Sequence, residues 1–363
     1  MLRCGIVGLP NVGKSTLFNA LTSSAAADAA NYPFCTIDPN FGAVAVPDRR
    51  LDKLAEIAES SKIIPTQVEF VDIAGLVKGA SDGQGLGNQF LSHIREVDCI
   101  IYVLRCFEDS DIVHVEGRVD PISDSEIIET ELILADLQSL IKRRPGIEKK
   151  SKQSKESAHQ LHLINDLIEV LNTGKPARTF LTQDNKKDVL NLQLLTSKPI
   201  LYVCNVSEND VISGNNWTNS VAEKCHNIEA NMVIISAQIE QEIANLNDAE
   251  EKQEFLKDLG LEESGLDKLI NVSYTTLGLI TFFTVGPKEA HAWTTAKGST
   301  APQAAGVIHT DFEKGFICAE TINVDDYIKY GGESKAKENG KLRLEGKEYV
   351  LNDGDVMHFR FNV

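Results

Sequence analysis

The chain has 363 residues and a formal net charge of −17 at pH 7, from 53 acidic and 36 basic side chains. This length supports two or three domains with full cores, and the acidic balance excludes a chain coated in basic surface, although a local basic patch is still compatible with nucleic-acid binding. The seven cysteines are scattered and lack C-x-x-C spacing, which is typical of reduced thiols. Because the sequence shows neither a signal-peptide pattern nor an apolar run of ~20 residues, we expect a soluble cytoplasmic protein with no membrane partner.

Short apolar runs alternate with helical patterns along most of the chain. The runs cover residues 4–7, 67–71, 99–104, 199–204 and 232–235. Several of them are apolar on both faces, which indicates a mainly parallel sheet covered by helices on both sides, the α/β class. Such sheets bind ligands at the carboxyl ends of their strands. We therefore expect a site built from the residues that follow each run.

The first run leads into Gly8-Leu9-Pro10-Asn11-Val12-Gly13-Lys14-Ser15, which fits the phosphate-loop pattern G-x-x-x-x-G-K-[ST] of P-loop NTPases. A helical pattern over residues 16–21 follows, so backbone N–H groups at a helix N-terminus would cradle phosphate oxygens. We predict that Lys14 reaches the β- and γ-phosphates as a catalytic group and that the Ser15 hydroxyl binds Mg²⁺. The predicted nucleotide-binding residues of this loop are Asn11, Val12, Gly13, Lys14, Ser15 and Thr16.

The second run ends in Asp72-Ile73-Ala74-Gly75, a D-x-x-G sequence one strand after the phosphate loop. A carboxylate at this position holds Mg²⁺ and the glycine N–H approaches the γ-phosphate, so we assign Asp72 to the metal and Gly75 to the nucleotide. Thr36, in a loop between the two motifs, is predicted as a second metal ligand; the alternative is a turn threonine. The glycines at 75, 79, 83, 85 and 87 predict a segment that changes shape with the nucleotide, the alternative being a surface loop.

Two later runs end where P-loop GTPases carry the guanine-reading sequences N-K-x-D and S-A-K. Here they end in Asn205-Val206-Ser207-Glu208 and in Ser236-Ala237. In N-K-x-D the aspartate accepts two hydrogen bonds from guanine and the lysine stem covers the base. Val206 replaces that lysine and Glu208 is one methylene longer than that aspartate, a mismatch that costs about 10²-fold or more when buried. The predicted base-binding residues are Asn205, Val206, Glu208, Ser236 and Ala237.

Leu76 stands directly after D-x-x-G, where many P-loop GTPases have the glutamine that orients the attacking water. Leucine cannot polarise water, so we predict slow intrinsic hydrolysis unless another group reaches the γ-phosphate. His114 is the predicted catalytic side chain, because it follows the strand pattern ending near Leu104 and titrates near neutrality. A surface histidine is the alternative. The other groups considered are Lys78, His93 and Arg95.

Almost a hundred residues separate the strand patterns at 99–104 and 199–204, more than a crossover helix needs. Apolar residues with 3-4-3-4 spacing predict an antiparallel helical hairpin inserted over residues 120–195 and bent near Pro145-Gly146. The two series are Ile127, Thr130, Leu134, Leu137 and Ile141, and Leu161, Ile164, Ile168 and Leu171. The tip, Lys142 to Lys155, has seven basic residues and one acidic residue, which favours contact with a phosphate backbone. The alternative is a solvated, lysine-rich turn.

From about Gly278 the pattern changes to strands over residues 279–285 and 356–361, with glycine turns between them. Residues 278–363 resemble a TGS domain, a ubiquitin-like β-grasp module found on translation-linked GTPases and synthetases. Its histidines lack metal-ligand spacing, so we expect a binding module for RNA or protein. The predicted organisation is a P-loop domain over 1–277, interrupted by the helical arm at 120–195, and a TGS-like domain over 278–363.

The N-x-x-E sequence, with residues 8–16, 31–40, 72–96 and the C-terminal region, resembles the YchF family, also called the Obg-like ATPases. This resemblance implies a P-loop protein that binds ATP at least as well as GTP and associates with the ribosome. Asn11 also resembles the asparagine of K⁺-activated members of the wider GTPase class, which implies K⁺ beside the nucleotide.

We therefore expect a Mg²⁺-dependent ATPase that acts as a ribosome- or RNA-associated switch through the basic tip and the TGS-like domain. The first alternative is a GTPase with nucleic-acid-binding activity. The second is a nucleotide-regulated binding protein whose hydrolysis is incidental. A metabolic kinase is less favoured because the sequence has no lid or acceptor-site signature. Nothing in the sequence demands a dimer, so we expect a monomer.

Overall fold

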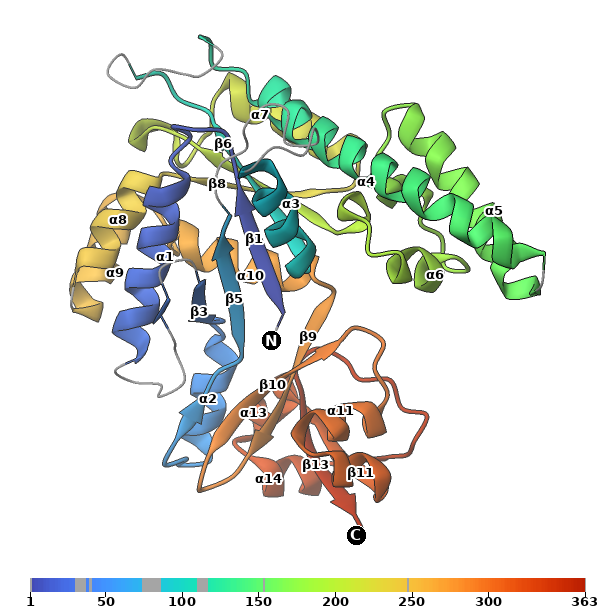
Figure 1. Cartoon of the computed structure of the whole chain (residues 1–363). Coiled ribbons are helices and arrows are strands. Elements are labelled where there is room, and N and C mark those ends of the chain that lie inside the picture. The colour runs from blue at the N-terminus through green and yellow to red at the C-terminus, as the bar shows by residue number, and fades with distance from the viewer. Residues whose placement is uncertain are drawn as a thin grey trace. The chain divides into compact units, whose positions relative to one another are not determined.

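The computed structural model describes seven segments of the chain (Figure 1). They are residues 2–29, 37–38, 41–73, 86–109, 117–152, 154–246 and 248–362. These residues form two compact units, one within 1–27, 36–42 and 69–269, and the other within 28–35, 43–68 and 270–363. Across the described segments, no helix combines the length and the apolar character that crossing a membrane requires.

A seven-stranded sheet of order β2-β3-β5-β1-β6-β7-β8 organises the first unit. Its strands are β1 (Arg3–Val7), β2 (Ile37–Asp38), β3 (Phe41–Ala45), β5 (Gln67–Asp72), β6 (Cys99–Arg105), β7 (Ile200–Asn205) and β8 (Asn231–Ile235). β1 pairs in parallel with β5 and β6, and parallel pairing continues through β7 to β8. The edge strands β2 and β3 are antiparallel. The predicted α/β class with a mainly parallel sheet is thus confirmed.

The central strands are covered on both faces, since every residue of β6 and β7 is buried. Figure 1 shows α1 and α3 on opposite sides of β1. The helices of this unit outside the arm are α1 (Lys14–Ala29), α3 (Leu86–Glu96), α7 (Asn216–Asn227), α8 (Ala237–Asn245) and α9 (Ala249–Asp258), with the start of α10 (Gly265–Thr276) and the 3₁₀ helix η4 (Glu208–Asp210). The register aligns Arg105 with Asn205 and Asn205 with Ile235, so the strands end at one edge of the sheet.

The insertion between β6 and β7 is a helical arm, as the apolar spacing predicts. Its elements are α4 (Pro121–Ser151), α5 (Lys155–Asn172), η2 (Ala177–Phe180), α6 (Lys186–Asn191) and η3 (Leu195–Ser197). α4 and α5 pack on each other through a core that contains Leu140, Ile164 and Leu167. The predicted packing face of α4 is wrong in part, because Leu134 and Ile141 are 40% and 53% exposed.

The predicted bend at Pro145-Gly146 is also wrong. α4 continues through both residues to Ser151, so the two helices are connected after Ser151 rather than at the proline. A proline inside a helix leaves the carbonyl four residues earlier without its N–H partner. Here that carbonyl belongs to the exposed Ile141, where water can take the place of the missing donor.

The second unit contains a six-stranded sheet of order β12-β11-β13-β9-β10-β4. Its strands are β4 (Ile63–Ile64), β9 (Leu279–Val285), β10 (Ala290–Ala296), β11 (Phe316–Asn323), β12 (Arg343–Glu345) and β13 (Asp355–Phe361), and its helices are α2 (Arg49–Ile57), α11 (Ala301–Ile308), α12 (Thr310–Lys314), α13 (Val324–Tyr330) and α14 (Glu333–Glu338). α11 and α12 pack on one face, around Phe282 and Phe359. α2, α13 and α14 pack on the other, around Phe283 and Val356.

Residues 43–68, which begin in β3 and end in β5 of the first sheet, cluster with this second unit, which the sequence did not indicate. Leu51 and Leu54 of α2 lie in the same core as Phe283, and β4 extends the sheet because Ile63 pairs with Ala290. A short amphipathic helix between two strands looks like an ordinary crossover helix, so its local pattern does not reveal which sheet it covers. The strands predicted at 279–285 and 356–361 are present as β9 and β13.

Candidate nucleotide-binding site

The phosphate loop joins β1 to α1 at the edge of the sheet where the parallel strands end. Asn11 and Gly13 have positive φ angles of 63° and 91°, which turn the backbone over the start of the helix. The N–H of Leu17 makes a helical hydrogen bond to the carbonyl of Gly13 at 3.0 Å. The N–H groups before it lie at the positive end of α1. This is the backbone geometry that an anion cradle requires.

Asn205 connects the phosphate loop to the turn that follows β8. Its Nδ2 donates to the carbonyl of Val12 at 2.9 Å, and its Oδ1 accepts from the N–H of Ala237 at 3.0 Å. Residue 13 must be glycine here, because a Cβ would lie 2.1 Å from Asn205 Nδ2. The side chain, 4% exposed, therefore holds both loops in a fixed relation.

The loops after β1, β7 and β8 line one open cavity of about 1230 Å³, large enough for a nucleoside triphosphate. The predicted residues that line it are Asn11, Gly13, Lys14, Ser15, Thr16, Asn205, Val206, Glu208, Ser236 and Ala237. Val12 does not line the cavity. Its side chain is buried, and its carbonyl accepts the hydrogen bond from Asn205. Residues far apart in the sequence are thus brought to one place by the common direction of the strands.

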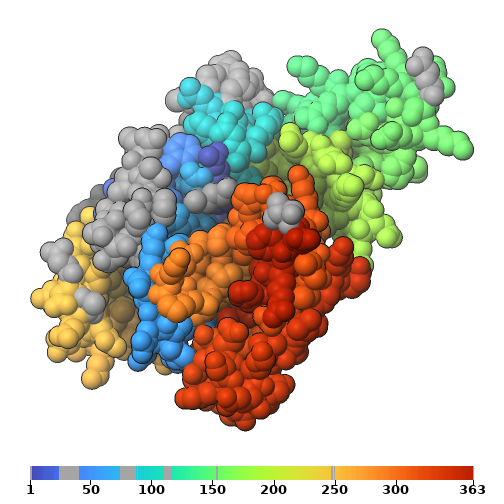
Figure 2. Space-filling view, turned by 90° about the horizontal axis from the view of Figure 1, so that it is seen from below, coloured from blue at the N-terminus to red at the C-terminus, as the bar shows by residue number. Residues whose placement is uncertain are grey.

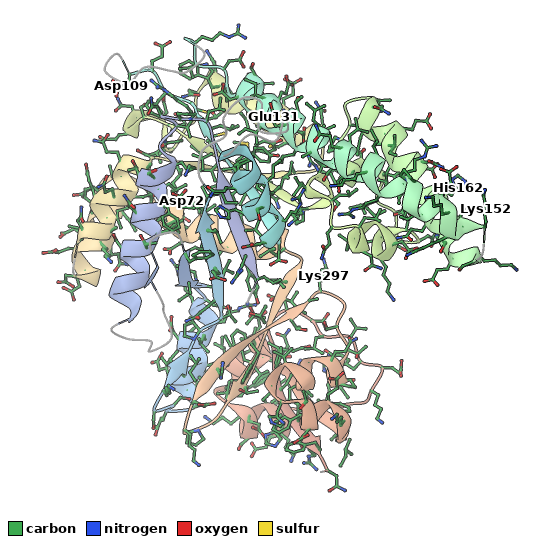
Figure 3. All side chains as sticks on the ribbon, in the orientation of Figure 1. Asp72, Asp109, Glu131, Lys152, His162 and Lys297 are labelled. Carbon is green, nitrogen blue, oxygen red and sulfur yellow. The ribbon has the colours of Figure 1, made fainter. Side chains whose placement is uncertain are left out.

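Lys14 and Asp72 form an ion pair between the start of α1 and the end of β5. Their side chains are 11% and 20% exposed. Asp72 is not among the cavity-lining residues, but this contact places its carboxylate beside the phosphate loop, near α1 (Figure 3). The Ser15 hydroxyl and the Asp72 carboxylate are hard oxygen donors of the type that Mg²⁺ takes, so the residues present fit the metal.

Val206 and Glu208 follow β7 and differ sharply in exposure. Val206 is 3% exposed, and its N–H donates to the carbonyl of Ile235 at 2.9 Å. Glu208 is exposed at the start of η4 and lines the cavity. Ser236 caps α8, its Oγ accepting from the N–H of Ile239. This part of the cavity therefore presents a buried aliphatic side chain and a carboxylate to a nucleotide base.

Sequence reasoning missed the residues that follow β6. Phe107, Glu108 and Asp109 line the same cavity. Arg105, 2% exposed, orders this turn: its Nε donates to the carbonyl of Phe107 at 3.1 Å and its Nη2 to that of Asp109 at 3.3 Å. β6 ends at the same sheet edge as β1 and β7, so the rule that located the other loops would also have located this one.

Several predicted residues lie outside the described segments, namely Thr36, Gly75, Leu76, Lys78 and His114. The assignments of Thr36 to the metal, Gly75 to the nucleotide and His114 to catalysis stay predictions. Of the other groups considered for hydrolysis, His93 on α3 lines a small cavity of about 50 Å³ together with Asp72, and Arg95 is exposed on the same helix.

Comparison with known proteins places this site in a family. Residues 3–127 match a family model described as "50S ribosome-binding GTPase". Residues 279–362 match the model YchF-GTPase_C, described as "Protein of unknown function (DUF933)". The curated "Ribosome-binding ATPase YchF" of Bacillus subtilis (strain 168) is 56% identical over 366 residues, covering 100% of both chains. The chain belongs to the YchF family.

Other members of the YchF family agree with this assignment. The "Ribosome-binding ATPase YchF" of Escherichia coli O157:H7 is 52% identical and covers 99% of each chain. The solved structure of the Schizosaccharomyces pombe YchF GTPase is 40% identical, with a TM-score of 0.88, covering 99% of this chain and 97% of that chain. The family resemblance and the P-loop fold expected from the sequence are confirmed.

In this YchF family member, Glu240 is a buried carboxyl on α8, the helix that begins at the cavity. It is fully buried and accepts the N–H groups of Gly265 at 2.8 Å and Leu266 at 3.2 Å, at the start of α10. Burial raises the pKa of Glu240 to about 7, and the two backbone hydrogen bonds only partly oppose that shift. The folded protein therefore favours the protonated carboxyl.

Replacing Glu240 by glutamine is expected to change how stability depends on pH. Because the folded pKa of about 7 exceeds the ordinary 4.5, this group's contribution to stability is complete below pH 4.5 and is lost as pH rises through 7. The stability of Glu240→Gln relative to wild type should rise by on the order of 2–3 kcal/mol between pH 5 and 8. Urea unfolding at several pH values measures this, with the exposed Glu242→Gln as control. A pH-independent difference would contradict the shift.

Proposed function

We propose that the chain is a Mg²⁺-dependent ATPase that acts as a nucleotide-controlled switch on the ribosome. Relatives named "Ribosome-binding ATPase YchF" are 56% and 52% identical to it over at least 99% of the chain. Within the chain, the phosphate loop and the N-x-x-E loop line one cavity of nucleotide size. The names of these relatives support ATPase activity. The residues that would contact the nucleotide base give a physical reason for a preference for ATP.

The preference for ATP rests on Val206 and Glu208. A guanine reader needs a carboxylate at one distance from N1–H and N2–H₂ and a lysine stem over the base, whereas adenine presents an acceptor at N1. Val206 is buried where that lysine would stand, and Glu208 brings a longer side chain to the cavity. This pair is the observation that carries the proposal, because it removes the reason to select GTP.

The phosphate end supplies charge neutralisation and positioning. Lys14 would bind the β- and γ-phosphates, and the N–H groups at the start of α1 would hold their oxygens. Ser15, Thr36 and Asp72 would hold Mg²⁺, which when bound neutralises phosphate charge and orients the transferred group. We place Gly75 on the γ-phosphate.

The groups that activate water are proposed from the sequence alone. Leu76 offers no polar atom, so intrinsic hydrolysis is slow, and we assign the role of water-orienting group to His114. Asn11 lines the cavity in an exposed position, which supports a K⁺ ion beside the phosphates. A partner that completes the site would raise the hydrolysis rate.

We assign the ribosome contact to the arm tip and to the TGS-like C-terminal region. All seven basic residues between Lys142 and Lys155 are exposed, and Lys152 lies at the outer end of the arm (Figure 3). Figure 2 shows the packed side chains of the arm in green. Arg143 is partly engaged, since its Nη1 donates to the carbonyl of Leu192 at 2.7 Å. The remaining cations suit a phosphate backbone.

A GTPase is the alternative that a specific observation favours. The 40% identical Schizosaccharomyces pombe relative is described as a YchF GTPase. The two proposals share the phosphate site and differ only at the base. Base competition therefore separates them, while ribosome binding does not.

The test of the proposed function is a titration of ATP and GTP with Mg²⁺ on the wild type and on the double variant Val206→Lys/Glu208→Asp. We expect ATP to bind at least as tightly as GTP to the wild type, and the double variant to shift the ratio toward GTP by about tenfold or more. Glu223→Asp, on the exposed surface of α7, is the control. GTP binding tenfold tighter to the wild type, about 1.4 kcal/mol, would favour the GTPase instead.

A further inference from the structure

Lys198 closes the C-terminal end of helix α3. It lies between η3 and β7, and its Nζ donates to the carbonyls of Ile94 at 2.7 Å and Arg95 at 2.8 Å and contacts that of Val97. The last carbonyls of a helix have no N–H partner within it, and the helix dipole favours a cation there. One ammonium group from a distant part of the sequence therefore satisfies the end of α3.

The residues just before Lys198 are bound to the arm. The N–H of Leu195 donates to Oδ1 of Asp136 at 2.8 Å, and the N–H and Oγ1 of Thr196 donate to its Oδ2 at 2.8 and 2.7 Å. Asp136 is a residue of α4 and is 2% exposed. Thr196 Oγ1 also accepts from the N–H of Ala177 at 2.9 Å. The Asp136 carboxylate thus joins α4 to η3 directly and to η2 through the Thr196 hydroxyl.

Placing the ammonium group of Lys198 in a half-buried position costs desolvation free energy that a surface lysine does not lose. Burial lowers the pKa of its ammonium to about 8, with Asp98 and Asp136 opposing the shift and Arg95 adding to it. A solvated side chain closes a helix end equally well without being desolvated. The three carbonyl contacts of this half-buried ammonium instead specify where the end of α3 lies relative to η3.

α3 is the first described element after Asp72 in the chain. It begins at Leu86, and the intervening residues include Gly75, assigned above to the γ-phosphate. The two ends of α3 therefore connect by sequence to the phosphate site and by hydrogen bonds to the arm. We propose that Lys198 is a positioning residue through which the nucleotide site and the arm influence one another. This inference rests on the proposed nucleotide-controlled function.

Coupling between two binding sites is reciprocal, and the factor by which one ligand changes the affinity for the other has a typical range. If bound nucleotide alters the arm's affinity for a partner, the partner alters nucleotide affinity by the same factor, typically about 5- to 150-fold. Two sites are coupled when a change between them alters their mutual influence while each site still binds its own ligand. The decisive variant must therefore break the connection and leave both binding sites in place.

The first experiment is hydrogen–deuterium exchange on the full chain, with and without a Mg²⁺-bound non-hydrolysable ATP analogue. In the wild type we expect the analogue to slow exchange in α3, in residues 195–198 and in the part of α4 around Asp136. In Lys198→Met the analogue should still slow exchange in α3 but no longer in residues 195–198 or in α4. The affinity of this variant for the analogue should stay within about twofold of wild type. Lys186→Met, an exposed lysine on α6, should behave as wild type.

Asp136→Asn supplies a second variant, because it weakens the arm side of the connection without touching α3. It should lose the same exchange response around α4, and adding Lys198→Met should cause no further loss, since both residues act in one connection. Independent, additive losses would overturn the proposal. So would an arm response that persists in Lys198→Met, or a wild type in which the analogue never reaches the arm.

The second experiment measures the affinity of 70S ribosomes for the chain with the ATP analogue and with ADP. We expect the wild-type ratio to fall to below about twofold in Lys198→Met. If wild-type chain does not bind ribosomes, the proposed function fails while the exchange experiment still decides the role of Lys198. If it binds with a ratio that Lys198→Met leaves unchanged, the coupling proposal fails and ribosome binding stands.

Discussion

Replacing Lys14 by methionine is expected to lower the single-turnover rate of ATP hydrolysis by about 10²- to 10³-fold. Methionine keeps an unbranched stem but removes the ammonium that would neutralise charge on the β- and γ-phosphates. This ammonium pairs with Asp72, whose side chain is 20% exposed and so retains contact with water when the cation is lost. The fold should therefore survive the substitution.

Phosphate release with the chain in saturating excess over Mg²⁺·ATP measures the Lys14→Met effect, and a thermal unfolding curve confirms that the variant is folded. Lys187→Met, on the exposed face of α6, is the matched control because it removes an equal charge outside the cavity. A variant rate within tenfold of wild type would mean that phosphate charge is neutralised elsewhere. The assignment of Lys14 as the catalytic cation would then be wrong.

Replacing Lys149, Lys150 and Lys152 together by glutamine is expected to weaken ribosome binding by about 10- to 100-fold near 0.1 M salt. Each lysine that neutralises a phosphate releases a counterion, so the slope of log affinity against log salt should fall by about two to three. Hydrolysis without ribosomes should not change, since the arm tip does not line the nucleotide cavity.

Co-sedimentation with ribosomes over a salt series measures both quantities for the arm-tip variant. The control replaces Lys53, Lys175 and Lys257, which are also exposed, and so changes the net charge equally. Equal weakening in the two triple variants would show that the arm tip contributes only overall charge. A loss confined to the tip variant places the contact on the outer end of the arm.

Much of the fold could be predicted because the decisive signals are local. The strands of the parallel sheet are short apolar runs, and every residue of β6 and β7 is buried as such runs indicate. The phosphate loop is defined by glycine spacing next to a strand and a helix. The N-x-x-E loop is located by its place after β7, and Asn205 indeed contacts both neighbouring loops.

What could not be predicted depends on contacts between distant residues. The apolar side chains of α2 show that it covers a sheet but not that its partners include Phe283. In α4 the buried residue is Ile133 and the exposed one is its neighbour Leu134, a one-residue choice that an apolar series does not resolve. The bonds of Lys198 to the end of α3 leave no sequence pattern at all.

The divided second unit determines when the chain can finish folding during synthesis. α2 ends at Ile57, but the strand that contributes Phe283 to its core starts only at Leu279, and β13 ends at Phe361. Leu51 and Leu54 therefore lack this core while residues 69–269, the remainder of the first unit, are translated, a state that favours aggregation. A nascent chain truncated before β9 should consequently need a chaperone bound to α2, even though its phosphate loop is already synthesised.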